Sequence, residues 1–200
     1  MMQPPPKRLR ELDVRAAIHR ELVPKLTGAA PSRVLDEFGI ANGTVRIDLA
    51  IFNCRSHGVE IKSEADTLAR LPSQAEMYGQ VFDTMAIVCG ENHLQAAVGI
   101  IPDWWAVYVA TRCSESICRL SEVRSGKQND GVDAHSLARL LWRAELIELL
   151  SSSFGPTISN RPAKWLWQIA AEAFQISELR TLVREKLKHR AGWRSALPRM

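Results

Sequence analysis

Apolar and polar residues alternate most regularly between residues 44 and 52. A period of two residues is typical of a β-strand whose two faces meet different surroundings. The alternation predicts that Ile47 and Leu49 lie on one face of this strand, and that Arg46 and Asp48 lie on the other. A charged side chain on a strand that otherwise resembles a core strand needs a partner, so this segment is a candidate for a functional site.

A second alternating run, Val59 to Lys62, follows turn-forming residues at 53–58. The short link between the two runs predicts an antiparallel pair of strands. Farther along, Pro72 is expected in the first turn of a helix that runs to about Val81, because proline fits at a helix start and disrupts a helix interior.

The remaining elements follow from the same periodicities. A helix over 11–22 is expected to end at Pro24, and residues 32–38 fit a short strand or a turn. Other strands are expected at 84–89, 104–111 and 117–123, and other helices at 92–98, 134–151, 162–174 and 177–190. We therefore expect an α/β fold, with a mixed sheet of four to five strands flanked by helices and an all-helical C-terminal extension.

The polar, glycine-containing stretch 125–133 separates two parts of different character. It predicts a sheet-containing core at 9–124 and a C-terminal helical subdomain at 134–200. The proline-rich residues 1–8 are expected to be a disordered lead.

Composition narrows the class of protein only modestly. The apolar fraction of 46% and the net charge of +4 are ordinary for a soluble protein and permit nucleic-acid binding without requiring it. No apolar run of about 18 residues appears, and the basic N-terminus has no apolar segment behind it. We expect a cytoplasmic protein that does not enter membranes, with its four cysteines as reduced, mostly buried thiols.

Three charged residues stand on the two neighbouring strands: Asp48, Glu60 and Lys62. Glu60 and Lys62 share a face of one strand, and pairing of the strands would bring Asp48 beside them. Two carboxylates with the backbone carbonyl of Ile61 suit Mg²⁺, for which Mn²⁺ can substitute, and the lysine can assist hydrolysis of a phosphodiester. On spacing alone, a cross-strand ion pair at the sheet surface explains these residues at least as well.

The order Asp48, Glu60-x-Lys62 resembles the PD-(D/E)XK nuclease superfamily, although the residue before the aspartate is not the proline of its name. Gln74 and Tyr78, four positions apart on the expected helix, resemble the Q-x-x-x-Y motif of its RecB-like branch. Similarity to a little-studied bacterial branch extends over nearly the whole chain. The resemblance implies a restriction-endonuclease-like fold and a Mg²⁺-dependent nuclease serving phage defence or DNA repair, with Gln74 and Tyr78 in the site.

The same resemblance implies an additional acid upstream of Asp48. Glu37 is the first choice, and Glu11 and Asp13 on the first helix are rivals. Each of these residues is equally well explained as an ordinary solvated acid.

Several residues are expected to contact nucleic acid. Near the site these are Arg46, Ser63 and Arg70, although Arg70 has Asp66 as an alternative partner in a salt bridge. On the last helix, Arg180, Arg184 and Lys188 could follow a phosphate backbone, form a solvated face, or take part in a homodimer or a contact with a partner protein. His57, in the turn between the two strands, is a candidate general base, but a histidine in a turn is more often simply exposed, and exposure is the expectation here.

These observations support a leading hypothesis and two alternatives. The first is a metal-dependent endo- or exonuclease acting on DNA. The second is a nucleic-acid-binding or assembly module that keeps the nuclease fold without turnover. The third is a nuclease directed at RNA, which the sequence does not separate from the first.

Overall fold

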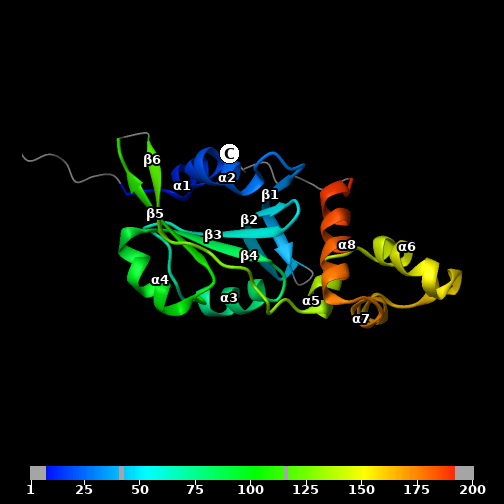
Figure 1. The fold of residues 1–200 in the computed structure, drawn as a ribbon. Coiled ribbons are helices and arrows are strands. Elements are labelled where there is room, and N and C mark those ends of the chain that lie inside the picture. Colours follow the sequence, from blue (N-terminus) through cyan, green and yellow to red (C-terminus); the bar gives the residue numbers. More distant parts are fainter. Residues whose placement is uncertain (1–7, 41–42, 115–116, 192–200) are drawn as a thin grey trace, which may run out of the picture.

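One mixed sheet organises the molecule in a computed structural model that describes residues 8–40, 43–114 and 117–191 (Figure 1). Its six strands lie in chain order. They are β1 (Arg33–Ile40), β2 (Val45–Phe52), β3 (Ser56–Lys62), β4 (Thr84–Gly90), β5 (Ala106–Arg112) and β6 (Cys118–Arg124). β3, β4 and β5 pair in parallel, and the other neighbours pair antiparallel, including the expected β2–β3 pair. The mixed α/β sheet is confirmed, with one strand more than expected because residues 33–40 form a full strand.

Helices cover both faces of the sheet. One face carries α1 (Glu11–Ala17), a π-helical turn (Ile18–Leu22) and α2 (Val23–Thr27). The other carries α3 (Leu71–Gly79) and α4 (Leu94–Ile100), the latter after a short 3₁₀ turn (Glu91–His93) (Figure 1). Parallel strands need long crossover connections, and α3 and α4 supply them between β3 and β4 and between β4 and β5.

The first helical segment does not end at Pro24, as the sequence predicted. The π-helical turn leads directly into α2, and Pro24 lies in the first turn of α2. A proline is harmless there because its missing N–H has no partner within the helix.

The side chains of β1 and β2 do not alternate regularly. Glu37 has a φ of +53°, in the left-handed region. Leu35 and Phe38 are three positions apart, so a regular strand would place them on opposite faces, but both pack into the same core. On β2, Ile47 packs into the core under α3, whereas Leu49 packs under α1 on the opposite face. The prediction that Ile47 and Leu49 share a face is therefore wrong.

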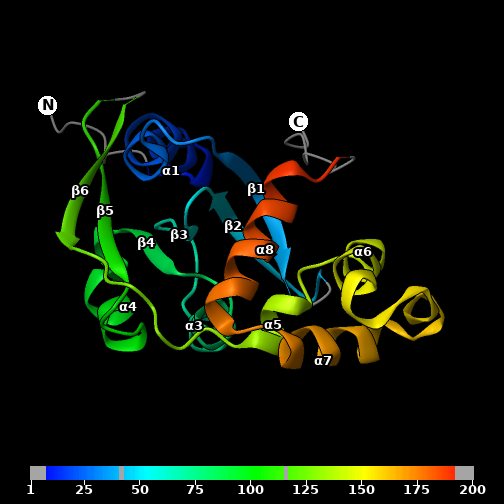
Figure 2. The same ribbon diagram turned by 45° about the vertical axis from the view of Figure 1, so that its right-hand side comes forward.

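The C-terminal region contains α5 (Ala134–Ala138), α6 (Arg143–Phe154), a 3₁₀ turn (Pro156–Asn160), α7 (Ala163–Ala173) and α8 (Ile176–His189). These helices gather at one end of the sheet (Figure 2). The helix expected at 134–151 is two helices. The C-terminal helices also share one hydrophobic core with the sheet, since Leu166 and Leu179 belong to the same cluster as Phe52 and Ile87.

The segment 125–133 is anchored to the sheet domain. The side-chain amide of Asn129 donates to the carbonyls of Gly79 and Phe82, at 2.6 and 2.8 Å. The expected disordered lead lies outside the described residues except for Arg8.

The described helices and the four cysteines bear on the expectations drawn from composition. Among the described helices, none has the length and apolar character needed to cross a bilayer. Cys89 and Cys118 are buried free thiols, whereas Cys54 and Cys113 are exposed, so burial holds for only half of the cysteines.

Candidate active site

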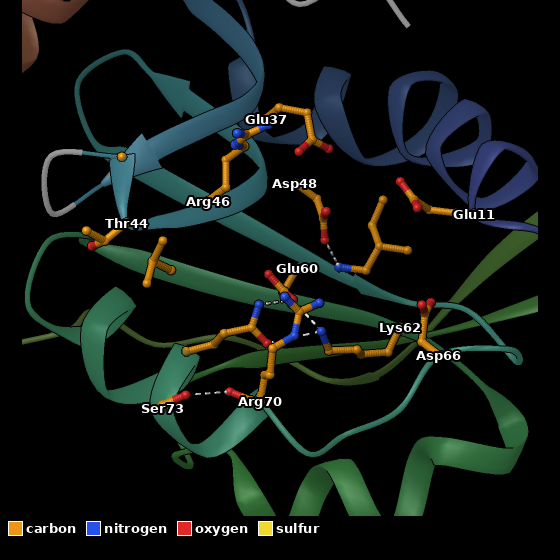
Figure 3. A pocket seen from close by; sticks show the side chains of 14 residues that line it. Glu11, Glu37, Thr44, Arg46, Asp48, Glu60, Lys62, Asp66, Arg70 and Ser73 are labelled. Carbon is orange, nitrogen blue, oxygen red and sulfur yellow. Dashed lines mark hydrogen bonds and ion pairs between the residues drawn. The ribbon is translucent and has the colours of Figure 1, made fainter. Parts of the chain in front are cut away.

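A cleft of about 470 Å³ opens where β2 and β3 separate (Figure 3). Its walls come from α1, from the β1–β2 hairpin, from β3 and from the loop that leads into α3. The lining residues are Glu11, Glu37, Gly43, Thr44, Val45, Arg46, Asp48, Glu60, Ile61, Lys62, Asp66, Arg70, Ser73 and Gln74.

Asp48 reaches the cleft because the two strands separate beside it. Pairing between β2 and β3 runs from Phe52 opposite Ser56 to Leu49 opposite Val59, and ends there. One residue farther, the carboxylate of Asp48 accepts a 2.6 Å hydrogen bond from the Ile61 N–H, in place of a strand partner. The N–H and C=O of one residue in an extended strand project to the same side, so the Ile61 carbonyl also faces the cleft.

Glu60 is held by three donors from its own strand and from α3. Its Oε1 accepts from Lys62 Nζ at 2.5 Å and from Gln74 Nε2 at 2.7 Å. Its Oε2 accepts from the Tyr78 hydroxyl at 2.8 Å. The side chains of Glu60 and Lys62 are only 3% and 6% exposed, so this is a buried ion pair inside a hydrogen-bond network. The structure therefore brings together Asp48, Glu60, Lys62, Gln74 and Tyr78.

Burial and charge act together on Asp48. Burial and the nearby negative charge of Glu60 raise the pKa of the Asp48 carboxyl to about 8, and the hydrogen bond from Ile61 opposes the shift. A carboxyl in this state binds a proton readily, and a cation that neutralises both acids would displace that proton.

Glu37 lines the same cleft. It lies on β1 between two residue pairs that flank Asp48 on β2, Asp36–Leu49 and Phe38–Ile47. Of the two rival acids, Glu11 also lines the cleft. Asp13, in the same first turn of α1, does not line it and pairs instead with Arg10 and Arg112. The sequence missed Arg15, which contacts both Glu11 and Glu37 and whose only local signal is its position four residues after Glu11 on the helix.

Arg46 and Arg70 line the cleft and are exposed. Within the described residues, neither guanidinium has an ion pair or a hydrogen bond, so the expected salt bridge between Arg70 and Asp66 does not form. Asp66 instead accepts from the N–H and the hydroxyl of Ser63, at 2.7 and 2.6 Å. Ser63 is buried and does not line the cleft, so the structure does not bring it together with Arg46 and Arg70.

The basic residues of α8 are engaged within the fold. Arg180 and Arg184 lie 3.5 and 3.1 Å from the buried carboxylate of Asp83, and Lys188 pairs with Glu185 at 2.8 Å. A buried carboxylate needs cationic partners, and α8 supplies them when it packs on the sheet. Part of the charge of Arg180, Arg184 and Lys188 is thus balanced within the fold, and their contact with nucleic acid stays a prediction.

His57 is buried on β3 rather than exposed in a turn. Its ring nitrogens contact Thr84 Oγ1 at 2.6 Å and Asn53 Oδ1 at 3.3 Å. Burial lowers the pKa of His57 to about 4, so the ring is neutral near pH 7. It does not line the cleft, which removes it as a general base there.

Comparison with known proteins identifies relatives of the chain. Residues 5–197 match the family described as Bacteriophage P4 protein cII. The chain belongs to this family. Protein cII of Enterobacteria phage P4 is 26% identical over 182 residues, which cover 91% of this chain and 68% of that protein. Among solved structures, SPO1766, a protein of unknown function from Silicibacter pomeroyi, matches with a TM-score of 0.43 and 16% identity, over 77% of this chain and 94% of that one.

The donor atoms in this member of the P4 cII family fit a small divalent cation. Asp48 and Glu60 supply carboxylate oxygens. Asp48 Oδ2 and Glu60 Oε2 each accept one of the hydrogen bonds described above and keep a second lone pair, whereas Glu60 Oε1 already accepts from both Lys62 and Gln74. The Ile61 carbonyl faces the same space. An all-oxygen set with room for water suits Mg²⁺ and Mn²⁺ rather than a thiophilic metal.

Proposed function

We propose that this protein is a Mg²⁺-dependent phosphodiesterase that hydrolyses DNA. The observation that carries the proposal is that Asp48, Glu60 and Lys62 line a single cleft. Their positions are supported by a 2.5 Å contact between Lys62 and Glu60 and by contacts to Ile61 and Gln74 that are 2.6–3.1 Å long.

The charge of the cleft supports a requirement for a cation. Its lining holds five acids against three bases: Glu11, Glu37, Asp48, Glu60 and Asp66 against Arg46, Lys62 and Arg70. Arg15, behind the lining, pairs with Glu11 and Glu37, so the repulsion of a phosphodiester comes mainly from the other acids until a cation neutralises them. A divalent ion between Asp48 and Glu60 would reduce this electrostatic repulsion at the position where the phosphodiester is cleaved.

The roles of the residues follow from their positions. The ion, when bound, would polarise a phosphoryl oxygen and lower the pKa of a bound water. The Lys62 ammonium, held by Glu60 and Gln74, offsets charge that develops on the phosphate. Arg46 and Arg70, exposed at the cleft, hold the flanking phosphates by paired N–H donors.

A cleavage panel tests the proposal. End-labelled single-stranded and duplex DNA and RNA of the same sequences are incubated with wild type, with Lys62→Ala and with Lys164→Ala, in Mg²⁺ and in EDTA. Lys164 is an exposed lysine on α7 and controls for loss of charge. We expect metal-dependent cleavage by wild type and Lys164→Ala and no cleavage by Lys62→Ala. Equal cleavage by wild type and Lys62→Ala would refute the proposal, and cleavage of RNA alone would redirect it to the RNA-directed alternative.

The alternative of a binding module without turnover depended on the basic face of the last helix. Because Arg180 and Arg184 pair with Asp83, that face has less charge to offer nucleic acid than the sequence suggested. The same panel separates the two functions, since a binding module would retain DNA in EDTA without cleaving it in Mg²⁺.

A further inference from the structure

The guanidinium of Arg15, on α1, lies among four acids. Its Nη1 donates to Asp36 Oδ1 at 2.9 Å and to the backbone carbonyl of Asp48 at 2.8 Å. Its Nη2 donates to Glu11 Oε1 at 2.7 Å and to Glu37 Oε1 at 2.8 Å, and lies 3.6 Å from Asp48 Oδ1. The side chain is 15% exposed, so these contacts are poorly screened by water.

Without Arg15 these acids would form a second cation position. Ligand oxygens of Glu11, Glu37 and Asp48 all lie within 4.8 Å of one another. Carboxylates at that separation repel one another unless a cation lies between them. Arg15 supplies the cation from within the chain.

Arg15 also holds the backbone that presents Asp48. Glu37 is the one non-glycine residue with positive φ in the described chain, a conformation that costs about 1 kcal/mol. The hydrogen bond from Arg15 to Glu37 and the one to the Asp48 carbonyl tie β1 and β2 to α1 at this position. One side chain therefore fixes both strands beside the proposed metal ligand.

We propose that Arg15 is a positioning residue that takes the place of a second metal ion, so that the cleft holds a single divalent ion, between Asp48 and Glu60. This inference rests on the proposed function. An arginine guanidinium keeps its charge in proteins, and an incoming ion would have to break the four hydrogen bonds that Arg15 donates here.

The test is the number of Mn²⁺ ions bound per chain, measured by electron paramagnetic resonance of free Mn²⁺ during a titration. We expect one ion for wild type and two for Arg15→Gln, which frees the Glu11–Glu37–Asp48 group. Arg10→Gln is the matched control, because Arg10 lies next to the same helix but is 70% exposed and, within the described part of the chain, pairs with Asp13 alone. We expect one ion for this variant.

A second variant keeps the inference testable if Arg15→Gln does not fold, which circular dichroism would reveal. Glu11 is half-exposed, and Glu11→Gln leaves Arg15 in place. If Glu11 pairs with Arg15 and does not bind a metal ion, the Mn²⁺ affinity of Glu11→Gln differs from that of wild type by less than about fivefold. A loss of about tenfold or more would make Glu11 a ligand and overturn the inference.

Other outcomes are equally decisive. Two ions bound by wild type, or one ion bound by folded Arg15→Gln, would overturn the inference and leave the proposed nuclease function standing. A wild-type protein that binds no ion would overturn both, and the DNA panel would then show no metal-dependent cleavage.

Discussion

Tyr78 and Glu60 are joined by a 2.8 Å hydrogen bond from the phenol to Oε2, although one residue lies on α3 and the other on β3. The same hydroxyl lies 2.9 Å from the carbonyl of Arg46 and accepts from Gln74 Nε2 at 3.1 Å. Burial, followed by the charge of Glu60, raises the pKa of Tyr78, so the hydroxyl keeps its proton and remains a donor. The helix thereby fixes the orientation of a buried carboxylate on the sheet.

Removing this hydroxyl is expected to slow cleavage without abolishing it. Tyr78→Phe leaves Glu60 with two of its three donors, so we expect a loss of about 10- to 100-fold in single-turnover rate, similar to that seen for groups that orient metal ligands. Tyr108→Phe is the control, because that hydroxyl contacts Glu122 on β6 at 3.3 Å. A Tyr78→Phe rate equal to that of wild type would show that the hydroxyl does not orient Glu60.

The raised pKa of Asp48 predicts how stability depends on pH in the absence of metal. The carboxyl has a pKa of about 8 in the folded protein, against 3.8 for a free aspartate side chain, so the folded state binds the extra proton between these values. Stability contributed by that proton is present at low pH and is lost as pH rises toward 8. We expect thermal unfolding in EDTA to show Asp48→Asn gaining stability over wild type as the pH increases.

The magnitude of this effect can be read from melting temperatures. Each kcal/mol corresponds to about 2–4 °C for a chain of this size. Saturating Mg²⁺ should cancel the advantage of the variant, because an ion at about 100 times its Kd stabilises wild type by about 2.7 kcal/mol. Parallel melting curves for the two proteins at every pH would contradict the assignment of the shift to Asp48.

Asp83 is expected to matter for stability and not for chemistry. Its side chain is 3% exposed and contacts Arg180, Arg184 and the N–H of Ser56. Asp83→Ala leaves two cations without their partner, which costs about 3–5 kcal/mol in urea unfolding. Asp103→Ala, at a carboxylate that is 98% exposed, should cost less than about 1 kcal/mol. Loss of cleavage by folded Asp83→Ala would show instead that α8 takes part in the reaction.

Arg46 and Arg70 are expected to bind phosphate. Arg46→Ala and Arg70→Ala should each weaken DNA binding and reduce the slope of log affinity against log salt by about 1. Fluorescence anisotropy in Ca²⁺, which is expected to support binding without turnover, measures both quantities. Arg119→Ala changes an exposed arginine on the edge strand β6 and should leave the slope unaltered. A slope unchanged in the Arg46 and Arg70 variants would place the substrate elsewhere.

The core of the site was predictable because its spacing is local. Glu60 and Lys62 are two residues apart on one strand, and a short turn links that strand to the one that carries Asp48. Gln74 and Tyr78 are four apart on a helix, so they face the same way. Strand and helix periods fix such relationships before any tertiary contact is known.

Contacts between distant segments could not be predicted in this way. Arg184 and Asp83 are 101 residues apart, and nothing in the pattern of α8 distinguishes an arginine that pairs within the fold from a solvated one. Arg15 meets Asp48 only because α1 packs on that face of the sheet. The left-handed Glu37 reverses the facing of β1, and glutamate gives no local signal for a positive φ.

The position of a bound ion tests the central claim most directly. A crystal soaked in MnCl₂ and measured at the manganese absorption edge should show one anomalous peak, within about 2.0–2.3 Å of carboxylate oxygens of both Asp48 and Glu60. A cleft without a peak, or a peak that contacts neither of these two residues, would contradict the account.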